Sequence, residues 1–213
     1  MKNNTIILGD SYSTFTDFIP NGYLSYYSEI EKPETDVTKV SQTWWAQVVN
    51  DANLNLILNN SWSGSTIGYT GYNNSDCSES SSFIFRLKEL IKDNFFVKNE
   101  IHKVFVFGGT NDSWADAPLG EMKFEDWTND DLYYVLPAIC YFFNLLRESL
   151  PQSEIYCMIN IGLKPEISSC LKTSSERYNI TPITFDTIDK RDGHPTIEGM
   201  KNIKDTVLKI LNS

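Results

Sequence analysis

Apolar residues are concentrated in five short runs along the chain, and the runs are rich in β-branched side chains. Because each run is continuous rather than alternating with polar residues, it is typical of a strand that is covered on both faces, as in a parallel sheet. The runs comprise residues 5–8, 54–58, 104–107, 155–161 and 180–185. The pattern therefore predicts five strands.

Segments with a helical spacing of apolar residues lie between these runs and after the last one. They are residues 44–49, 83–91, 132–146 and 197–211. Pro195 and Thr196 provide a start signal for the final segment. The alternation of strands and helices predicts an α/β fold with a doubly wound parallel sheet and right-handed crossovers. With 213 residues, 41% of them hydrophobic, the chain is expected to fold as one domain, residues 1–213.

Two long connections interrupt this alternation. Residues 12–41 follow the first predicted strand, and residues 112–128 follow the third. Connections of this length are usually functional covers or mobile segments. In a doubly wound sheet, ligands bind beyond the carboxyl ends of the strands. We therefore expect both connections to shape a substrate pocket at that edge.

Four short polar motifs each come after a predicted strand. They are Gly9-Asp10-Ser11, Ser63-Gly64, Gly109-Thr110-Asn111-Asp112 and Asp192-Gly193-His194-Pro195. Because the carboxyl ends of parallel strands meet at one edge of a sheet, the motifs should gather there. A serine, a histidine and hydrogen-bond donors around one carbonyl are the groups that acyl transfer requires.

Ser11 is the candidate nucleophile, because a tight turn after the first strand would present its hydroxyl at this edge. A serine needs a base with a pKa near neutrality, and the chain has two histidines, His102 and His194. His102 precedes the third strand, so we expect it at the opposite edge, on the surface. His194 follows the fifth strand and is the candidate base. The alternative is that His194 only caps the final helix.

Gly64 and Asn111 are candidate donors to an oxyanion. A glycine lets its N–H approach a ligand closely, and the Asn111 amide follows glycines that give the chain room to turn. A plain turn glycine and an Asx turn are the alternatives. We interpret Asp10 and Asp112 as structural residues that fix turns through hydrogen bonds from side chain to backbone.

The four motifs resemble the conserved blocks of the SGNH/GDSL hydrolase superfamily, and they span the chain from near its start to its last helix. The resemblance implies a flavodoxin-like, three-layer α/β/α sandwich built on a five-stranded parallel sheet. It implies that Ser11 is the nucleophile and His194 the base. It also implies an oxyanion hole made by the N–H groups of Ser11 and Gly64 and the amide of Asn111. Acetylated sugars, lipid esters, thioesters and other small acyl esters are the substrates it suggests.

The sequence departs from the family at the acid that orients the base. The family usually has an aspartate three residues before the histidine, where this chain has Arg191. Asp192 and Asp189 stand two and five residues before His194. Because altered spacing redirects a side chain, neither is assured of meeting the imidazole. Asp192 is the candidate catalytic acid; otherwise Asp189, a backbone carbonyl, another acid or a water orients the ring, and without an acid Ser11 and His194 act as a dyad.

Charge and composition narrow the range of partners. The formal net charge is -10, and no cluster of Lys and Arg could follow a phosphate backbone, so neither nucleic acid nor an anionic membrane surface is expected as a partner. The apolar runs are too short for membrane insertion. The four cysteines are expected to be buried or idle thiols, with a disulfide as the alternative and no zinc site.

The predicted chemistry requires neither a metal nor an organic cofactor, and its only expected partner is the ester substrate. The first strand begins almost at once, which leaves no room for an export signal ahead of it. The cytoplasm is therefore the default compartment, with a removed leader as the alternative. The sequence does not indicate an oligomeric state.

The leading hypothesis is a serine esterase that hydrolyses a small or carbohydrate-linked carboxylic ester through an acyl-enzyme, with deacetylation as one candidate reaction. Trp62 and Trp114 are candidate substrate-binding residues, because they lie in loops that leave the active edge; packing of those loops is the alternative. One rival hypothesis is a lysophospholipase or thioesterase for longer acyl chains, which the polar, tyrosine-rich loops disfavour. Another is a catalytically degenerate domain that binds carbohydrate.

Overall fold

The computed structural model describes residues 2–212. Its main sheet has five parallel strands in the order β2-β1-β3-β4-β5. The strands are β1 (Asn4–Gly9), β2 (Asn55–Ser61), β3 (Lys103–Phe107), β4 (Glu154–Ile159) and β5 (Thr181–Thr184). The five strands that the sequence predicts are all present, with small shifts at their ends.

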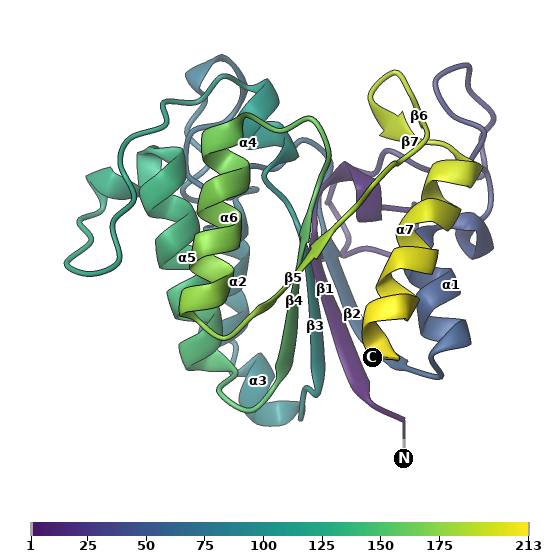
Figure 1. The fold of residues 1–213 in the computed structure, drawn as a ribbon, viewed down its shortest axis with the longest axis horizontal. Coiled ribbons are helices and arrows are strands. Elements are labelled where there is room, and N and C mark those ends of the chain that lie inside the picture. The colour runs from purple at the N-terminus through teal and green to yellow at the C-terminus, as the bar shows by residue number, and fades with distance from the viewer. Residues whose placement is uncertain (1, 213) are drawn as a thin grey trace.

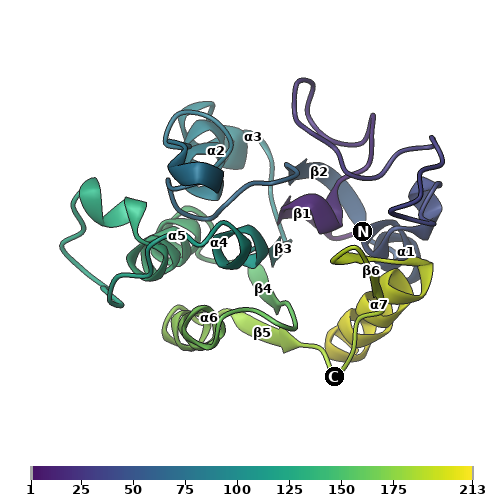
Figure 2. The ribbon, with the colours of Figure 1, turned by 90° about the horizontal axis from the view of Figure 1, so that it is seen from above.

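Helices cover both faces of the sheet, as Figures 1 and 2 show. One face carries α1 (Trp44–Asp51) and α7 (Ile197–Leu211), and the other carries α2 (Phe83–Lys92), α5 (Val135–Ser149) and α6 (Pro165–Arg177). The short helices α3 (Phe95–Lys98) and α4 (Thr110–Trp114) lie toward opposite ends of the molecule (Figure 1). The expected three-layer α/β/α sandwich is therefore confirmed.

Alternate strand residues face opposite layers, so each layer has its own core. The first core joins Ile6, Leu8, Val104 and Val106 of the sheet to Phe83, Leu87, Phe142 and Phe143 of α2 and α5. The second joins Ile7, Phe105, Phe107 and Met158 to Trp44, Val48, Ile203 and Val207 of α1 and α7. Strands with apolar residues on both faces explain why the sequence pattern is continuous.

The strand register brings the segments that carry the motifs together. Gly9, the last residue of β1, pairs with Ser61 of β2 on one side and with Phe107 of β3 on the other. A Cβ atom at Gly9 would lie 2.5 Å from the Ser61 hydroxyl oxygen, so this close approach requires glycine. Because the chain passes from β1 to β2 on one side and later to β3 on the other, the strand order reverses at β1, where ligands bind in such folds.

Hydroxyl side chains cap three of the main helices. The side-chain oxygens of Thr43, Ser82 and Thr196 accept hydrogen bonds from backbone N–H groups in the first turns of α1, α2 and α7. Each cap satisfies a donor that the helix itself leaves unpaired. The predicted start of the final helix is confirmed.

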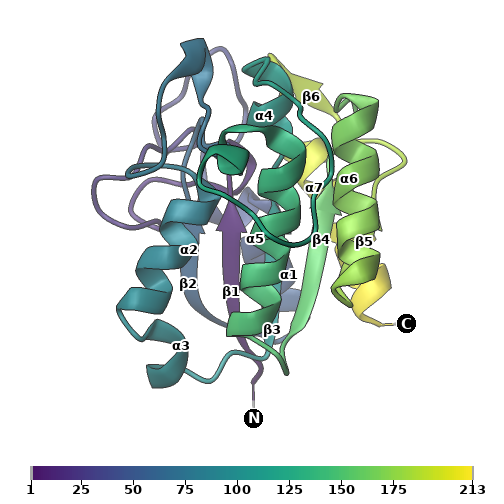
Figure 3. The same ribbon diagram turned by 90° about the vertical axis from the view of Figure 1, so that its left-hand side faces the viewer.

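Helix α6 was not predicted, because its sequence is largely polar. It begins with Pro165 at its first position, and its buried face combines Ile167 and Leu171 with Cys170 and Ser174. A thiol and a hydroxyl take places that apolar side chains usually occupy, so the helical spacing is hard to recognise. In Figure 3, α6 lies beside α5 in the same layer.

The predicted helix at residues 132–146 begins later than expected. A 3-10 helix, Asp130–Tyr133, precedes α5, which starts at Val135. In the part of the chain that the structure describes, three further 3-10 helices lie in the connections: Ser11–Ser13, Val40–Gln42 and Tyr72–Asn74. None of the helices within residues 2–212 has the combined length and hydrophobicity that crossing a membrane would require.

The cysteines do not form disulfides in the structure. All four are free thiols, and Cys140, Cys157 and Cys170 are buried. This agrees with the interpretation of these residues as buried or idle thiols.

Candidate active site

The chain turns sharply after β1 and brings Ser11 to the carboxyl edge of the sheet. Asp10 caps the 3-10 helix that follows, and its Oδ1 accepts a hydrogen bond from the N–H of Tyr12 at 3.0 Å. Thr14 closes the turn, because its hydroxyl donates to the carbonyl oxygen of Ser11 at 2.9 Å. The position of Ser11 is thus fixed by side-chain hydrogen bonds on both sides.

His194 lies in a small hairpin between β5 and α7. In this hairpin β6 (Lys190–Arg191) pairs with β7 (His194–Pro195) in the antiparallel direction. The two residues of the turn both have positive φ, 47° at Asp192 and 77° at Gly193. An Asp-Gly pair with two positive φ values is typical of a type I′ hairpin turn. The turn conformation therefore accounts for this dipeptide.

The nucleophile and base candidates lie within hydrogen-bond distance. Nε2 of His194 is 3.0 Å from Oγ of Ser11, and Nδ1 is 3.1 Å from the main-chain carbonyl oxygen of Asp192. Because a carbonyl can only accept, Nδ1 carries the proton and Nε2 is free to take one from the serine. Burial lowers the pKa of His194 from its ordinary value of 6.5, so the imidazole is neutral at neutral pH.

The two candidate acids are arranged differently from the aspartate of a catalytic triad. Asp192 contacts the imidazole through its main-chain carbonyl oxygen rather than its carboxylate. The carboxylate of Asp189 accepts a hydrogen bond from the hydroxyl of Thr196 at the start of α7. Across residues 2–212, His194 makes its side-chain hydrogen bonds to Ser11 and to the Asp192 carbonyl, and none to a carboxylate.

The second histidine lies at the opposite edge, as the strand direction predicts. Nδ1 of His102 accepts a hydrogen bond from the N–H of Asn4, the first residue of β1, at 3.1 Å. Its Nε2 lies 3.9 Å from a carboxylate oxygen of Glu100. His102 is partly exposed, at 40% of its side-chain surface.

Three aromatic rings surround the imidazole of His194. The ring of Tyr26 is stacked on it, with centroids 3.6 Å apart and planes inclined by 7°. Tyr12 and Trp114 approach at centroid distances of 5.5 and 5.7 Å. Tyr26 belongs to the connection of residues 12–41, which was expected only to shape the substrate pocket. No sequence signal distinguishes Tyr26 from the other tyrosines of that connection.

Two tyrosine hydroxyls hold the backbone on either side of His194. The hydroxyl of Tyr12 donates to the carbonyl oxygen of Gly193, and the hydroxyl of Tyr27 donates to that of Pro195 at 2.9 Å. Both tyrosines come from the segment that follows β1. The first long connection therefore fixes the histidine segment.

Asn111 lies at the start of α4 and is buried. Its Nδ2 donates to the carbonyl oxygen of Ser65 at 2.9 Å, and its Oδ1 accepts from the hydroxyl of Tyr72 at 2.8 Å. These bonds fix the direction of the amide. An amide NH₂ group has two N–H donors, and the second one does not take part in the bond to Ser65. Gly109, just before the helix, has a φ of 91°, which favours glycine.

Gly64 is linked to Asn111 through the next residue. Because Asn111 donates to Ser65, the loop that carries Gly64 is attached to the start of α4. Gly64 is exposed and has a φ of 81°. A Cβ atom there would meet no atom within 4 Å, so backbone conformation rather than lack of space accounts for the glycine.

Asp10 and Asp112 form the side-chain to backbone hydrogen bonds expected of structural residues. The Asp112 carboxylate accepts from the N–H of Ile67 at 3.0 Å and from that of Gly68 at 3.4 Å, which joins α4 to the loop after β2. Burial raises the pKa of Asp10 to about 7 and that of Asp112 to about 6.

A buried arginine that the sequence motifs did not indicate joins three of the segments at this edge. Arg86 of α2 is 1% exposed. It donates to the carbonyl oxygen of Gly9 at 3.2 Å, to the hydroxyl of Ser65 at 3.1 Å and to the side chain of Asn60 at 2.6 Å. Burial lowers its pKa to about 10, so it stays charged at neutral pH. Its place beside Phe83 on the apolar side of α2 is the signal that could have identified it.

The two candidate substrate-binding tryptophans have different surroundings. Trp62 packs against Tyr23 of the first long connection, with ring centroids 4.2 Å apart. Trp114 is 42% exposed, and its ring is inclined by 70° to the His194 imidazole in a T-shaped contact. The structure thus brings Trp114 next to the candidate base, whereas Trp62 packs one loop against another.

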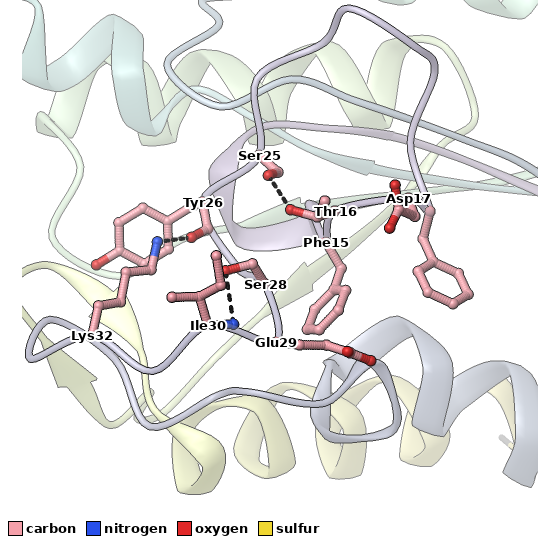
Figure 4. A pocket seen from close by; sticks show the side chains of 10 residues that line it. Phe15, Thr16, Asp17, Ser25, Tyr26, Ser28, Glu29, Ile30 and Lys32 are labelled. Atoms are coloured by element: carbon pink, nitrogen blue, oxygen red, sulfur yellow. Dashed lines mark hydrogen bonds between the residues drawn. The ribbon is translucent and has the colours of Figure 1, made fainter.

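A cavity of about 380 Å³ lies within the first long connection (Figure 4). Its walls combine the apolar side chains of Phe15, Phe18 and Ile30 with the charged groups of Asp17, Glu29 and Lys32. Tyr26 also lines this cavity, and the ammonium group of Lys32 lies 4.6 Å from the centroid of its ring. The tyrosine that stacks on His194 therefore also borders a pocket.

Comparison with known proteins identifies the family. The family model described as GDSL-like lipase/acylhydrolase matches residues 3–211. A solved structure assigned as a GDSL-like lipase from Bacteroides ovatus is 39% identical, with a TM-score of 0.92 over 100% of this chain and 99% of that one. A second, from Bacteroides uniformis, is also 39% identical, with a TM-score of 0.91 over 99% and 96% of the two chains. No curated protein sequence matches the chain.

A more distant solved structure shares the fold. It is a family two carbohydrate esterase from Clostridium thermocellum in complex with cellohexaose, with 15% identity, a TM-score of 0.66 and coverage of 99% of this chain and 64% of that one.

The chain belongs to the GDSL-like lipase/acylhydrolase family. It is a carboxylic ester hydrolase of the serine hydrolase class, as the sequence motifs predict.

Proposed function

We propose that the protein is a serine esterase that hydrolyses small or carbohydrate-linked carboxylic esters through an acyl-enzyme, with Ser11 as nucleophile and His194 as base. The observation that carries this proposal is the 3.0 Å distance between Oγ of Ser11 and Nε2 of His194. A nucleophile and a base in contact are the central requirement of this chemistry. Because Ser11 and His194 come from opposite ends of the chain, we propose that residues 1–213 act as one domain.

In the first half-reaction Oγ of Ser11 bonds to the carbonyl carbon of the ester while Nε2 of His194 takes its proton. The tetrahedral intermediate then breaks the bond to the alcohol oxygen, which receives the proton from His194. Water attacks the acyl-enzyme in the same way, with His194 again as base, and releases the acid and free Ser11.

The negative oxygen of the intermediate is stabilised by three donors: the N–H groups of Ser11 and Gly64 and the side-chain amide of Asn111. Support for Asn111 comes from its buried, fixed amide, since a donor that is already oriented needs no reorganisation during the reaction. Support for Gly64 comes from its link to Asn111 through Ser65.

We propose that the main-chain carbonyl of Asp192, rather than a carboxylate, orients the base. The 3.1 Å contact to Nδ1 of His194 supports this role. With a main-chain carbonyl in place of a carboxylate, the catalytic group is a dyad of Ser11 and His194. Loss of a triad acid lowers activity without abolishing it, so a dyad is compatible with an active enzyme.

Carbohydrate-linked esters are favoured as substrates because aromatic side chains surround the proposed site. Trp114 borders His194 and, at 42% exposed, is available to contact a sugar ring, and the rings of Tyr12 and Tyr26 also lie against His194. Aromatic rings combine apolar area with a polar handle, which suits amphipathic ligands such as sugars. The distant carbohydrate esterase with the same fold agrees with this choice.

The proposal is tested with p-nitrophenyl acetate, octanoate and palmitate and with acetylated xylo- and cello-oligosaccharides. We expect turnover of the acetate esters, a loss of at least about 10³-fold in kcat for Ser11→Ala and His194→Gln, and no loss for His102→Gln as the matched control. A strong preference for palmitate would favour the long-chain alternative. Absence of turnover with every ester would contradict the proposal, and a melting temperature raised by oligosaccharides would then favour the binding alternative.

A further inference from the structure

The imidazole of His194 is oriented by an aromatic ring. The Tyr26 ring lies parallel to it at a centroid distance of 3.6 Å. The hydrogen bonds of Nδ1 to a main-chain carbonyl and of Nε2 to Ser11 fix two atoms of the imidazole, but the ring can still rotate about the line between them, so its plane is less well defined. A second ring stacked against the first fixes that plane, and with it the direction in which Nε2 points.

The surroundings of His194 do not favour a positive charge. When Ser11 gives up its proton, the imidazole becomes an imidazolium in a partly buried place, with Lys32 and Lys190 as nearby cations that oppose the charge. Asp192 is the acid whose charge favours it, and this effect is smaller than that of burial. The face of an aromatic ring carries partial negative charge and attracts cations, so the Tyr26 ring can offset part of this cost.

The backbone of Tyr26 is connected to the nucleophile through one side chain. The N–H of Tyr26 donates to the hydroxyl oxygen of Thr14 at 2.8 Å, and the same hydroxyl donates to the carbonyl oxygen of Ser11 at 2.9 Å. The ring that faces His194 and the serine that His194 contacts are therefore held by a common residue. Lys32 donates to the carbonyl oxygen of Tyr26 from the other direction.

We propose that Tyr26 is a positioning residue for the base: its ring sets the plane of the His194 imidazole and stabilises the imidazolium, the task that a triad carboxylate performs in other serine hydrolases. This inference rests on the proposed function, because it assigns Tyr26 a role only if His194 moves the proton between Ser11 and the alcohol. It gives the first long connection a part in the chemistry beyond enclosing a pocket.

The test compares Tyr26→Phe, which keeps the ring and loses the hydroxyl, with Tyr26→Leu, which loses the ring. Tyr133→Leu is the matched control, because Tyr133 is also half-buried and packs against a ring, that of Tyr69, instead of against His194. Each variant is assayed with ethyl acetate and p-nitrophenyl acetate. Ethoxide must take the proton from His194 as it leaves, whereas p-nitrophenolate leaves without one, so a misplaced imidazolium affects the ethyl ester more.

For Tyr26→Leu we expect kcat/KM, which reports the formation of the acyl-enzyme, to fall about tenfold or more with the ethyl ester and by less with the p-nitrophenyl ester. Tyr26→Phe should stay within about threefold of the wild type, as should Tyr133→Leu. A Tyr26→Leu enzyme as active as wild type, or an equal loss with both esters, would overturn the proposal. So would a tenfold loss in Tyr26→Phe, even if Tyr26→Leu failed to fold. A Ser11→Ala enzyme with wild-type activity would instead overturn the proposed function.

Discussion

The hydroxyl of Tyr12 donates a hydrogen bond to the main-chain carbonyl of Gly193, so the residue after the candidate nucleophile holds the residue before the candidate base. The two partners are 181 positions apart in the chain. The ring of Tyr12 also packs edge-on against Phe107 of β3, which anchors the contact in the sheet. The bond joins the turn after β1 directly to the hairpin that carries His194.

Replacing Tyr12 with Phe should keep the ring packing and remove this bond. We expect the free energy of unfolding to fall by about 1 kcal/mol and kcat to fall with little change in KM, because the hairpin then positions His194 less well. Urea unfolding and steady-state ester hydrolysis measure the two effects. Tyr133→Phe removes a hydroxyl far from the hairpin and is the control. Unchanged kcat in Tyr12→Phe would show that the bond does not position the base.

The variant Asp192→Asn tests whether the main-chain carbonyl or the carboxylate of Asp192 orients the His194 imidazole. Asn tolerates the positive φ of this turn position and keeps the main-chain carbonyl, so we expect kcat within about threefold of the wild type. Loss of a true triad aspartate lowers kcat by about 10⁴-fold. The assay is turnover of p-nitrophenyl acetate, and a fall of that size would restore the carboxylate as the orienting group.

Arg86 offers a test of how the active edge is held together. Arg86→Met would leave the acceptors on Gly9, Asn60 and Ser65 without their buried donor. Each unsatisfied buried group costs about 1–3 kcal/mol, so we expect a loss of at least about 3 kcal/mol in the free energy of unfolding. Arg147→Met, which removes a partly exposed arginine in the last turn of α5, should cost less. Equal losses in the two variants, measured by urea unfolding, would contradict the assigned role of Arg86.

The pH dependence of activity should follow the lowered pKa of His194. Burial disfavours the charged imidazolium in the free enzyme, and only the neutral ring can accept a proton from Ser11. The acid limb of kcat/KM should therefore have an apparent pKa below 6.5, with activity falling as the pH drops through it. Lys32→Gln removes a cation that lowers this pKa, so it should move the limb to higher pH. A limb above 6.5 in the wild type, or a shift in the opposite direction, would contradict this account.

The strands and the order of the motifs are predictable because each depends on local pattern. A parallel strand covered on both faces needs a continuous apolar run, and such runs are legible without knowledge of the rest of the chain. The direction of the strands then places Ser11 and His194 at one edge and His102 at the other, which the contact between His102 and Asn4 bears out.

Helix α6 and Arg86 escaped prediction for a common reason. Both involve buried polar groups whose hydrogen-bond partners lie far away in the sequence. Ser174 of α6 lies beside the thiol of Cys140 on α5, and Arg86 finds acceptors on β1, β2 and the loop after β2. Hydrophobic periodicity can place a polar residue on a buried face, as it does for Arg86 beside Phe83, but it carries no information about the partners that satisfy such a residue.

The surroundings of His194 could be predicted only in part. The Asp-Gly dipeptide is a local turn signal, but its consequence, a main-chain carbonyl turned toward Nδ1, depends on the hairpin conformation. The stacked ring of Tyr26 comes from an irregular connection whose path no sequence periodicity describes. Loops of this kind are positioned by scattered tertiary contacts, such as the bond from Tyr27 to Pro195.

The most direct test of the central claim is the site of covalent labelling by a fluorophosphonate, mapped by peptide mass spectrometry. If Ser11 is the nucleophile and His194 its base, the wild type should carry one label on Ser11, His194→Gln should react much more slowly, and Ser11→Ala should not react. A label on another residue, or equal labelling of Ser11→Ala, would contradict the account.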